Sequence, residues 1–450
     1  SEKMIGVFDK KQLDVFCRPA QGMATSDNGR FLRSWHEVSS DKIGIGLSDS
    51  VQALQSQKKW FPYNKGGAFR KWYGNQEHVV NWENDGFEIR NFKKSVVRNP
   101  STYFHKSISW SKISSGSIAF RMFPNGFIYD VAGTSLFLYN NDMLAYYLGL
   151  LNSNVIMHVL EVISPTLNYE VGQVASLPIT EKNIDNVSYL STRNIEISKQ
   201  DWDAHETSWD FEQNELVYMA TNAINLSNIE ENPDLPISAL VDTFKEKWSE
   251  NFYQLHANEE ELNRQFIEIY GLQDELTPDV PLDEITILQQ GEISIEDNQI
   301  LWHEDVLMKQ LISYIIGLIM GRYRLDKPGL HIAHPEPSSD ELAPYTYNGK
   351  TIEIDDDAIV PILPDDSPFA DNLHNRIKDY IRIIFGDDIL TQNLNYVEQA
   401  LSKGINDYLQ KDFYTDHKKM YQNRPIYWLF SSKKGAFRCL VYMHRMDAYT

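Results

Sequence analysis

Residues 58–75 read KKWFPYNKGGAFRKWYGN, and the expected fold rests on the pattern in this stretch. Trp60–Tyr63 is a short run rich in aromatic residues, which is typical of a β-strand. Asn64-Lys65-Gly66-Gly67 follows it, and asparagine and glycine at this place favour a hairpin turn. Comparable runs recur nearby: Val38 with Ile43 and Ile45, Val79–Trp82 before Asn84-Asp85-Gly86, and Ile118–Phe123 before Pro124-Asn125-Gly126. The sequence therefore predicts a β-rich domain of short strands and hairpins.

A helical pattern interrupts these strands. Asp142 can cap it, apolar residues recur at three- and four-residue spacing from Leu144 to Val159, and Pro165 ends it. Beyond Asn183 the same spacing dominates, as expected for a helical bundle. The expected fold class is therefore α+β, with a mixed β-rich domain followed by a mainly α-helical region.

The helical region is itself interrupted. Lys327–Pro368 is polar and rich in proline, and it is either an inserted loop or a small β element. Helical spacing returns at Asn372–Phe385 and Asn395–Leu409. The last residues, which follow Val441–Arg445, resemble a continuing helix, so the chain is expected to be part of a longer protein.

Composition limits the classes of protein to which the chain can belong. At roughly 100 to 200 residues a domain, 450 residues predict two to four domains. Cys17 and Cys439 show no pairing pattern, which predicts neither disulfides nor a thiolate metal site and favours a reducing, cytoplasmic setting. The longest apolar run, Leu311–Met320, is far shorter than the ~20 residues of a membrane helix, so no membrane association is expected.

The net charge of −21 is unevenly distributed along the chain. Residues 1–180 contain 19 basic and 15 acidic groups, whereas residues 181–450 contain 23 and 48, a net charge of −25. Within the first part, residues 58–121 contain 12 basic and four acidic groups. Because phosphate affinity depends on local lysine and arginine contacts, this segment predicts double-stranded DNA as a partner.

No pattern predicts catalysis or a metal site in this chain. Four groups offer suitable side chains: Gly44-Ile45-Gly46 for a nucleotide, His331 with His334 for a metal, Asp355–Asp357 with Asp365-Asp366 for Ca²⁺ or Mg²⁺, and Asp242, Glu246 and Lys247 for a nuclease. The first lacks a third glycine, prolines exclude a helix at the second, and the third lacks EF-hand spacing. The fourth lacks the spacing that a nuclease requires.

Cations and amides alternate with aromatic residues in residues 58–75, and further cations follow. Lysine and arginine can neutralise phosphates, and asparagine and arginine can read base edges. The expected DNA-binding residues are Asn64, Lys65, Arg70, Lys71, Asn75, Lys93, Lys94, Arg98 and Arg121, with Asn64, Asn75 or Arg70 near the bases. The alternative is that the rings form the core and the cations its solvated rim.

Several blocks of sequence resemble a known family. They are Gln21–Phe31, Lys58–Asn75, Ser164–Val174 with Leu177-Pro178-Ile179, Asp201-Trp202-Asp203, Glu206–Phe211, Asn258–Arg264, Tyr270–Leu276, Gly321-Arg322-Tyr323 and Arg424–Phe430. Together they resemble the C-terminal half of the adenine-specific DNA methyltransferases of the BREX phage-defence systems, the PglX family, which are related to type IIG restriction-modification enzymes. The opening half of residues 31–180 also resembles, more weakly, the recognition domains of type I specificity subunits, in which a helix and a stretch like Asn168–Gly172 close the strand-rich region.

The resemblance implies an organisation of the chain. Residues 1–30 would join a missing methyltransferase domain and residues 31–180 would recognise the DNA target. The rest would comprise a helical domain at 181–326, an insertion at 327–370 and a C-terminal helical region at 371–450. The family binds S-adenosylmethionine and holds the flipped adenine with an Asn-Pro-Pro-Tyr type motif. Here the nearest string is Arg98-Asn99-Pro100-Ser101, and no glycine-rich cofactor loop occurs, so both belong to the full-length protein.

The sequence therefore predicts the target-recognition part of an adenine-specific (N6) DNA methyltransferase, inactive alone because base chemistry needs a pocket formed by another domain. Two alternatives stay open. The acidic part could bind other defence-system proteins or mimic DNA in a partner's groove, and a nuclease would require a divalent metal.

Overall fold

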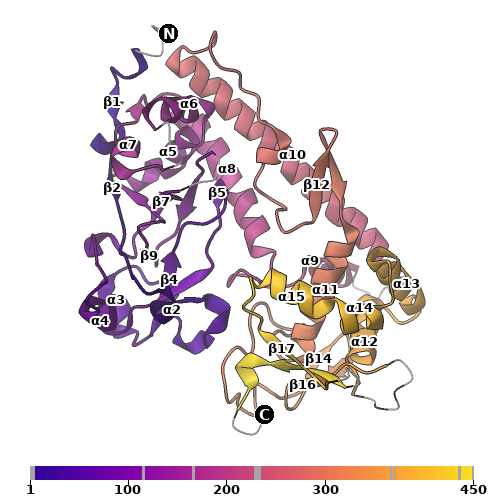
Figure 1. Cartoon of the computed structure of the whole chain (residues 1–450). Coiled ribbons are helices and arrows are strands. Elements are labelled where there is room, and N and C mark those ends of the chain that lie inside the picture. Colours follow the sequence, from indigo (N-terminus) through magenta and orange to yellow (C-terminus); the bar gives the residue numbers. More distant parts are fainter. Residues whose placement is uncertain are drawn as a thin grey trace. The chain divides into compact units, whose positions relative to one another are not determined.

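The computed structural model describes residues 6–113, 117–164, 168–227, 235–364, 367, 369, 371–433 and 437–447, with only the backbone for 223–227 (Figure 1). The chain forms two compact units. The first contains residues 1–35, 42–202 and 250–287, and the second contains residues 36–41, 203–249 and 288–450. Pro165, the expected end of a helix, lies outside the described residues, and so do Asp365 and Asp366, which have side chains suited to Ca²⁺ or Mg²⁺.

Two mixed sheets form the centre of the first unit. The five-stranded sheet has the order β2 (Cys17–Ala20), β10 (Ser135–Leu138), β7 (Ser107–Trp110), β8 (Phe120–Phe123) and β5 (Trp72–Tyr73). The four-stranded sheet has the order β3 (Leu32–Ser34), β6 (His78–Asn81), β4 (Trp60–Asn64) and β9 (Ile128–Tyr129). Strands β1 (Lys11–Gln12) and β11 (Pro178–Ile179) pair with each other. Residues before position 31 thus take part in the sheets of this unit.

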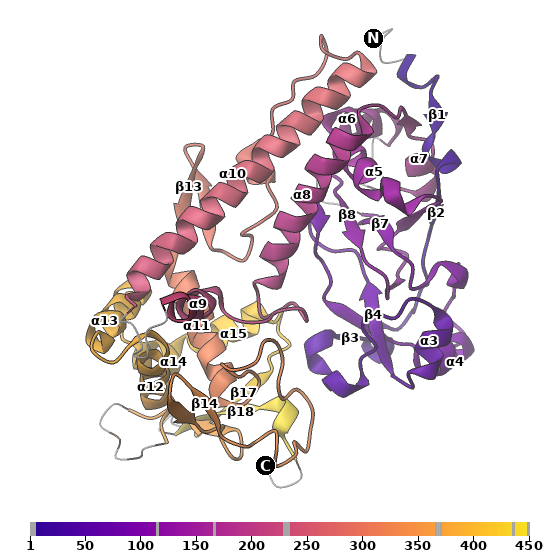
Figure 2. The same ribbon diagram turned by 180° about the vertical axis from the view of Figure 1, so that it is seen from behind.

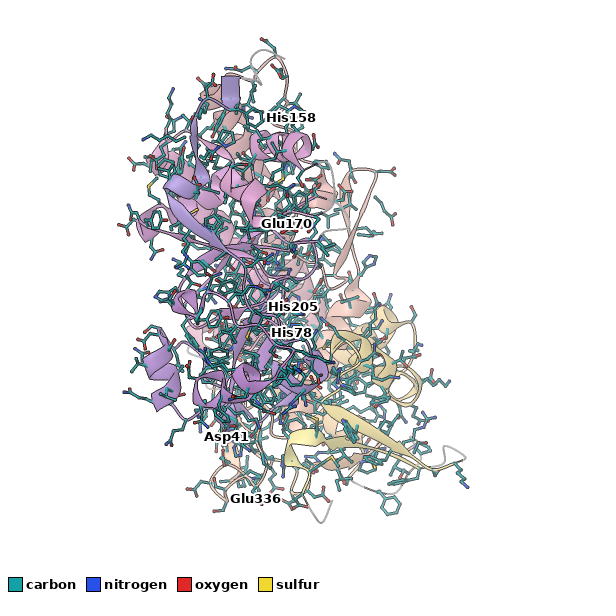
Figure 3. The ribbon with its side chains drawn as sticks, turned by 60° about the vertical axis from the view of Figure 1, so that its left-hand side comes forward. Asp41, His78, His158, Glu170, His205 and Glu336 are labelled. Carbon is teal, nitrogen blue, oxygen red and sulfur yellow. The ribbon has the colours of Figure 1, made fainter. Side chains whose placement is uncertain are left out.

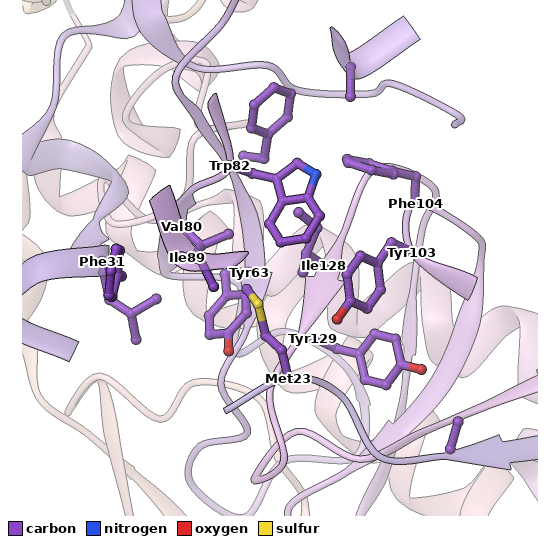
Figure 4. Close-up of a cluster of buried hydrophobic side chains, with 14 residues drawn as sticks. Met23, Phe31, Tyr63, Val80, Trp82, Ile89, Tyr103, Phe104, Ile128 and Tyr129 are labelled. Carbon is purple, nitrogen blue, oxygen red and sulfur yellow. The ribbon is translucent and has the colours of Figure 1, made fainter. Parts of the chain in front are cut away.

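Aromatic side chains fill the core beside the four-stranded sheet (Figure 4). The rings of Trp82 and Tyr103 meet edge to face with centroids 5.4 Å apart, and those of Tyr103 and Tyr129 do so at 5.6 Å. Edge-to-face pairs of this kind are favourable beyond the area that they bury. The aromatic residues of the strand pattern are therefore mainly core.

Helices cover both sheets, with α3 (Ser50–Gln55) and α4 (Glu83–Asn91) beside the four-stranded sheet and α7 (Val171–Ala175) beside the other (Figures 1 and 2). The helix expected from Asp142 to Val159 divides into α5 (Leu144–Leu151) and α6 (Asn154–Ile163). The division occurs where Asn152 hydrogen-bonds both the N–H and the carbonyl of Phe120, at 2.9 Å each.

The turn positions expected from sequence exist, but the expected hairpins do not form. β4 pairs with β6 and β9, whereas β5 pairs with β8, so the turn after Asn64 carries the chain from one sheet to the other. The turn at Pro124-Asn125-Gly126 likewise connects β8 to β9 in the other sheet. The expected strand at Val38–Ile45 is also wrong, because Trp35–Glu37 and Ser40–Lys42 form 3-10 turns. Strand pairing is nonlocal, so local turn chemistry did not specify it.

The second unit is mainly helical (Figure 2). Its helices are α9 (Glu215–Ser227), the first part of α10 (Ile237–Tyr270), α11 (Glu304–Ile319), α12 (Leu373–Phe385), α13 (Leu390–Leu401), α14 (Ile405–Lys411) and α15 (Phe413–Met420). The remainder of α10, after Ser249, belongs to the first unit. Helix α8 (Ile184–Asp203) also belongs to the first unit, up to Trp202. The α+β fold class is thus confirmed.

Three small sheets accompany these helices. They are β12 (Ile293–Glu296) with β13 (Gln299–Trp302), β14 (Tyr345–Tyr347) with β15 (Lys350–Ile352), and the order β16 (Ile359–Pro361), β18 (Arg438–Tyr442) and β17 (Tyr427–Ser431). The proline-rich passage therefore contains a β element. Val441 pairs with Trp428 and Ile359 in the three-stranded sheet. Residues 448–450, at the end of the segment expected to continue as a helix, lie outside the described residues.

Within the described part of the chain, no single helix is long and apolar enough to cross a membrane. Residues 141–151 and 154–163 satisfy that criterion only as a pair, and they meet at a 72° bend. Cys17 and Cys439 are both free and buried.

Candidate nucleic-acid interface

The turn after β4 is held by a buried amide. Asn64 is 1% exposed, and its Nδ2 donates to Ser109 Oγ at 2.6 Å and to the Gly133 carbonyl at 3.0 Å. Its Oδ1 accepts a hydrogen bond from the Gly66 N–H at 3.0 Å. The expectation that Asn64 reads a base is therefore corrected. All of its polar atoms already join segments of the sheets.

Asn75 has a related role at the other end of this loop. Its backbone is left-handed, with φ +57°, and its Nδ2 donates to the Ala68 carbonyl at 2.9 Å. The side chain is 9% exposed, so it closes the loop from within rather than facing a base. Trp72, also in the loop, is buried at φ +68°, a rare conformation for a bulky residue that the surrounding packing must stabilise.

Arg70 is buried against helix α8. Its Nη2 lies 2.6 Å from Asp201 Oδ2, its Nε donates to the Tyr73 carbonyl at 2.8 Å, and its guanidinium lies 4.9 Å from the centre of the Trp202 ring. Both charged side chains are less than a tenth exposed. A phosphate could reach Arg70 only if this ion pair broke, so the expected DNA contact is corrected to a structural one.

Lys71 is buried in the same way against helix α10. Its Nζ lies 2.8 Å from Glu259 Oε2 and 3.7 Å from a carboxylate oxygen of Glu284. Trp72 Nε1 donates to the other oxygen of Glu259 at 2.7 Å. Lys71 is therefore also corrected from a phosphate contact to an anchor between the loop and the helix.

Arg121 is fully buried on β8, opposite Ser109 on β7 and Trp72 on β5. Its Nη2 donates to Ser111 Oγ at 3.0 Å, and its Nε has no partner among the described residues. Burial, followed by the nearby charge of Arg70, lowers the pKa of Arg121 to about 10. The expected direct contact of Arg121 with DNA does not exist in this buried position.

Lys65 differs because it stays near the surface. Its Nζ lies 2.8 Å from Asp130 Oδ2, and the lysine side chain is 29% exposed. Asp130 also accepts hydrogen bonds from the Tyr63 hydroxyl at 2.7 Å and the Ala132 N–H at 2.8 Å. Lys65 is thus paired with a buried carboxylate, while its own side chain stays partly exposed to solvent.

Backbone pairing continues beyond β9 and extends the four-stranded sheet. Met23 bridges to Asp130 in parallel, and Ala24 bridges to Val96 in antiparallel fashion. Ser26 Oγ donates to the Lys94 carbonyl at 2.8 Å, which extends the same register. Gly22 allows the close approach, because a Cβ there would lie 1.9 Å from the Tyr129 carbonyl oxygen. The Gln21–Phe31 block thus holds residues 94–98 beside the sheet.

This register places three cations at one edge. Residues 22–26 run parallel to β4. Lys65 directly follows the C-terminal end of β4, and Lys94, next to Lys93, lies beside Ser26 at the C-terminal end of residues 22–26. Lys93 and Lys94 are exposed, and no ion pair of theirs is present among the described residues. We call Lys65, Lys93 and Lys94 the basic edge.

Arg98 and Asn99 lie at the opposite end of that strand pair. Asn99 Nδ2 donates to the Gln21 carbonyl at 2.9 Å, and its Oδ1 accepts from Arg18 Nη2 at 2.9 Å. The amide of the string nearest to Asn-Pro-Pro-Tyr is thus engaged within the fold. Arg98 is half-buried, and its Nη1 is buried without a partner among the described residues.

The groups with metal-ligand side chains have other partners. His331 Nε2 hydrogen-bonds the Glu341 carbonyl, and His334 Nε2 lies 2.8 Å from the Glu341 carboxylate. Asp355 pairs with Arg376. In the part of the chain that the structure describes, no three His, Cys, Asp or Glu side chains gather as a metal site.

A buried cluster in the second unit was not expected from sequence. Glu206 accepts hydrogen bonds from Ser313 and Tyr421 at 3.3 Å each, and burial raises its pKa to about 7 although the charge of Arg322 opposes this. Arg322 is fully buried and donates to the hydroxyls of Tyr323 and Tyr442. The blocks Glu206–Phe211 and Gly321-Arg322-Tyr323 were sequence signals here, but spacing alone does not reveal that they form one cluster.

A small pocket borders this cluster, and His205 lies in its wall. Figure 3 labels His205 among the side chains of the whole chain. Its volume of about 20 Å³ is enough for roughly one water molecule. His205 Nε2 lies 2.6 Å from Glu292 Oε1. Burial opposes ionisation of Glu292, but the charge of His205 and its hydrogen bond lower the Glu292 pKa to about 2. The pocket is too small for a nucleobase or an adenosyl cofactor.

No protein-family model matches the chain. In an alignment 462 residues long that covers 98% of the chain, it is 38% identical to the adenine-specific methyltransferase PglX of Lacticaseibacillus casei (strain Zhang). In an alignment 458 residues long that covers 96% of the chain, it is 36% identical to the adenine-specific methyltransferase BrxX of Escherichia coli O9:H4 (strain HS). Each match covers 36% of the relative, so the chain spans about a third of their length. The chain is thus homologous to a portion of the adenine-specific methyltransferases PglX and BrxX.

Proposed function

We propose that the chain recognises and positions duplex DNA for an adenine-specific DNA methyltransferase. The observation that carries this proposal is its homology, over nearly its whole length, to about a third of two such enzymes. Methyl transfer and S-adenosylmethionine binding belong in this proposal to regions of the parent protein outside that third.

The basic edge supports DNA as the partner. Residues 94–96 lie three strand spacings from β4, or ~14 Å at ~4.8 Å each, which is close to the ~12 Å width of the major groove. Lys65 on one side and Lys93 and Lys94 on the other could therefore contact phosphates on both sides of a groove. Their exposure and the lack of carboxylates beside Lys93 and Lys94 among the described residues favour such contacts.

Salt-dependent binding of duplex DNA tests the basic edge. Replacing Lys65, Lys93 and Lys94 by alanine should weaken binding to all sequences and reduce the slope of log K against log salt by about 2.7, or ~0.9 for each phosphate contact. Lys11→Ala with Lys182→Ala, which removes exposed lysines elsewhere in the first unit, is the matched control. Equal affinities and slopes for the triple variant and the wild type would exclude this surface.

Target choice requires the full-length parent. Replacing residues 31–180 by those of a relative should change the methylated sequence in a genome-wide map of N6-methyladenine. If the modified sequence stays the same, recognition lies elsewhere in the parent protein.

The charge of the second half favours one alternative, a module that binds proteins or imitates DNA. Residues 181–450 carry a net charge of −25. In that case the intact chain would bind a basic partner protein and duplex DNA would compete for the partner, not for the chain. A competition assay with labelled DNA separates the two.

A further inference from the structure

Arg121 is a buried cation that lacks a counter-ion. It is fully buried, and no carboxylate of a described residue lies within ion-pairing distance of its guanidinium. Residues 114–116, which lie outside the described ranges in the loop before β8, contain no acidic side chain. An arginine cannot easily discard its proton, and a buried charge is costly unless it is paired. The fold therefore keeps a positive charge here at a cost to stability.

The nearest charged neighbour does not supply compensation. Arg70 is close enough to lower the pKa of Arg121, and its own carboxylate partner, Asp201, lies 2.6 Å from Arg70 Nη2. Asp201 is thus engaged by Arg70, and Glu259 is engaged by Lys71. The charge of Arg121 is left without a carboxylate partner among the described residues.

A short chain of hydrogen bonds connects this charge to the surface. Arg121 Nη2 donates to Ser111 Oγ at 3.0 Å, and Ser111 Oγ donates to the Gly67 carbonyl at 2.9 Å. Gly67 and Ala68 are exposed, and Gly66 and Gly67 have left-handed backbones with φ +81° and +139°. Glycine at such positions lets a ligand approach the backbone closely. Ser111 and the Gly67 carbonyl lie between the guanidinium and an anion at this turn.

We infer that a backbone phosphate of duplex DNA binds at the Gly67–Ala68 turn, with Arg121 as its buried counter-charge and Ser111 between them. This inference rests on the proposed DNA-binding function and adds a fourth cation to it. The interaction is screened less by salt than a contact of a surface lysine, because protein surrounds the guanidinium. Arg121 thus positions the DNA through charge without reading a base edge.

The test compares Arg121→Met with the wild type in the whole chain. Because the charge has no protein partner, its removal should leave the melting temperature unchanged or raise it. Affinity for duplex DNA should fall roughly tenfold through loss of the buried charge, and the salt slope should fall by less than the ~0.9 of a direct phosphate contact, because protein shields this charge from salt. Arg322→Met, at another fully buried arginine, is the control: it should lower the melting temperature and leave the affinity of the folded protein unchanged.

Other outcomes separate this inference from the proposed function. If Arg121→Met lowers the melting temperature while affinity and salt slope remain those of the wild type, Arg121 is only structural and the inference fails. Inorganic phosphate provides a reading independent of DNA: it should raise the melting temperature of the wild type more than that of Arg121→Met. If the wild type binds no duplex DNA but shows this phosphate effect, the anion site stands and the proposed function fails. No phosphate effect in a wild type that binds no DNA overturns both.

Discussion

Lys71 Nζ lies 2.8 Å from Glu259 Oε2, and both side chains are less than a tenth exposed. The two residues are 188 positions apart in sequence. Their ion pair attaches the loop of residues 66–75 to helix α10, and the pair of Arg70 with Asp201 attaches the same loop to α8. The loop is thus attached by ion pairs to carboxylates on two helices. The part of α10 that carries Glu259 belongs to the first unit together with this loop.

Breaking this pair should destabilise the first unit. Glu259→Gln leaves the buried Lys71 charge with only the more exposed carboxylate of Glu284, 3.7 Å away. We expect a loss of about 3 kcal/mol in the free energy of unfolding. Lys71→Met with Glu259→Gln should recover much of the loss, because no unpaired charge stays buried. Denaturant unfolding measures both. In the control, Glu196→Gln removes the exposed partner of Arg193 and should cost less than about 1 kcal/mol.

Gly22 should tolerate no side chain. Alanine there would place its Cβ 1.9 Å from the Tyr129 carbonyl oxygen, so β9 or residues 21–24 would have to move, at a cost of roughly 2–4 kcal/mol. Gly172→Ala, in helix α7, meets no atom within 4 Å and should be neutral or slightly stabilising. Thermal unfolding compares the two variants. Equal stability would show that residues 21–24 are not paired with β9 as described.

Acidification should unfold the second unit partly through His417. Its Nε2 accepts hydrogen bonds from the N–H groups of Ile426 and Tyr427, and burial, followed by the charge of Arg322, lowers its pKa to about 3. The unfolded chain binds this proton near pH 6.5, so the stability contribution is present above pH 6.5 and is lost as the pH falls towards 3.

His417→Gln removes that titration. Between pH 7 and pH 4, the free energy of unfolding of the variant should fall by about 3 kcal/mol less than that of the wild type. Urea unfolding at several pH values measures the difference. His158→Gln, at a partly exposed histidine, should follow the wild-type curve.

Glu206 should have the opposite pH dependence. Burial raises its pKa to about 7 from a usual value of 4.5, so the folded state binds the proton more tightly than the unfolded state. The stabilising contribution is complete below pH 4.5 and is lost as the pH rises through 7. As the pH rises from 5 to 8, the free energy of unfolding of Glu206→Gln should therefore increase relative to that of the wild type by up to about 3 kcal/mol, as measured by urea unfolding. A constant difference between the two proteins over this range would contradict a buried, protonated Glu206.

Local sequence predicted the element types well and their pairing poorly. Trp60–Tyr63 and Val79–Trp82 lie almost entirely in β4 and β6, because alternating apolar residues and turn residues act over a few positions. The chain nevertheless changes sheets after Asn64, and the strand expected near Ile43 is absent. Pairing partners come from distant parts of the chain, where short-range patterns have no influence.

The candidate site divides in the same manner. The excess of positive charge in residues 58–121 and the dominance of strands and turns there follow from the amino-acid sequence alone. Which of these cations face solvent depends on tertiary packing, because the partners that bury a side chain lie far away in sequence. Arg70 and Lys71 are buried against Asp201 and Glu259, whereas Lys65, Lys93 and Lys94 lie at the same end of neighbouring strands and reach solvent. A charge is a property of one residue, but its availability to DNA depends on everything packed around it.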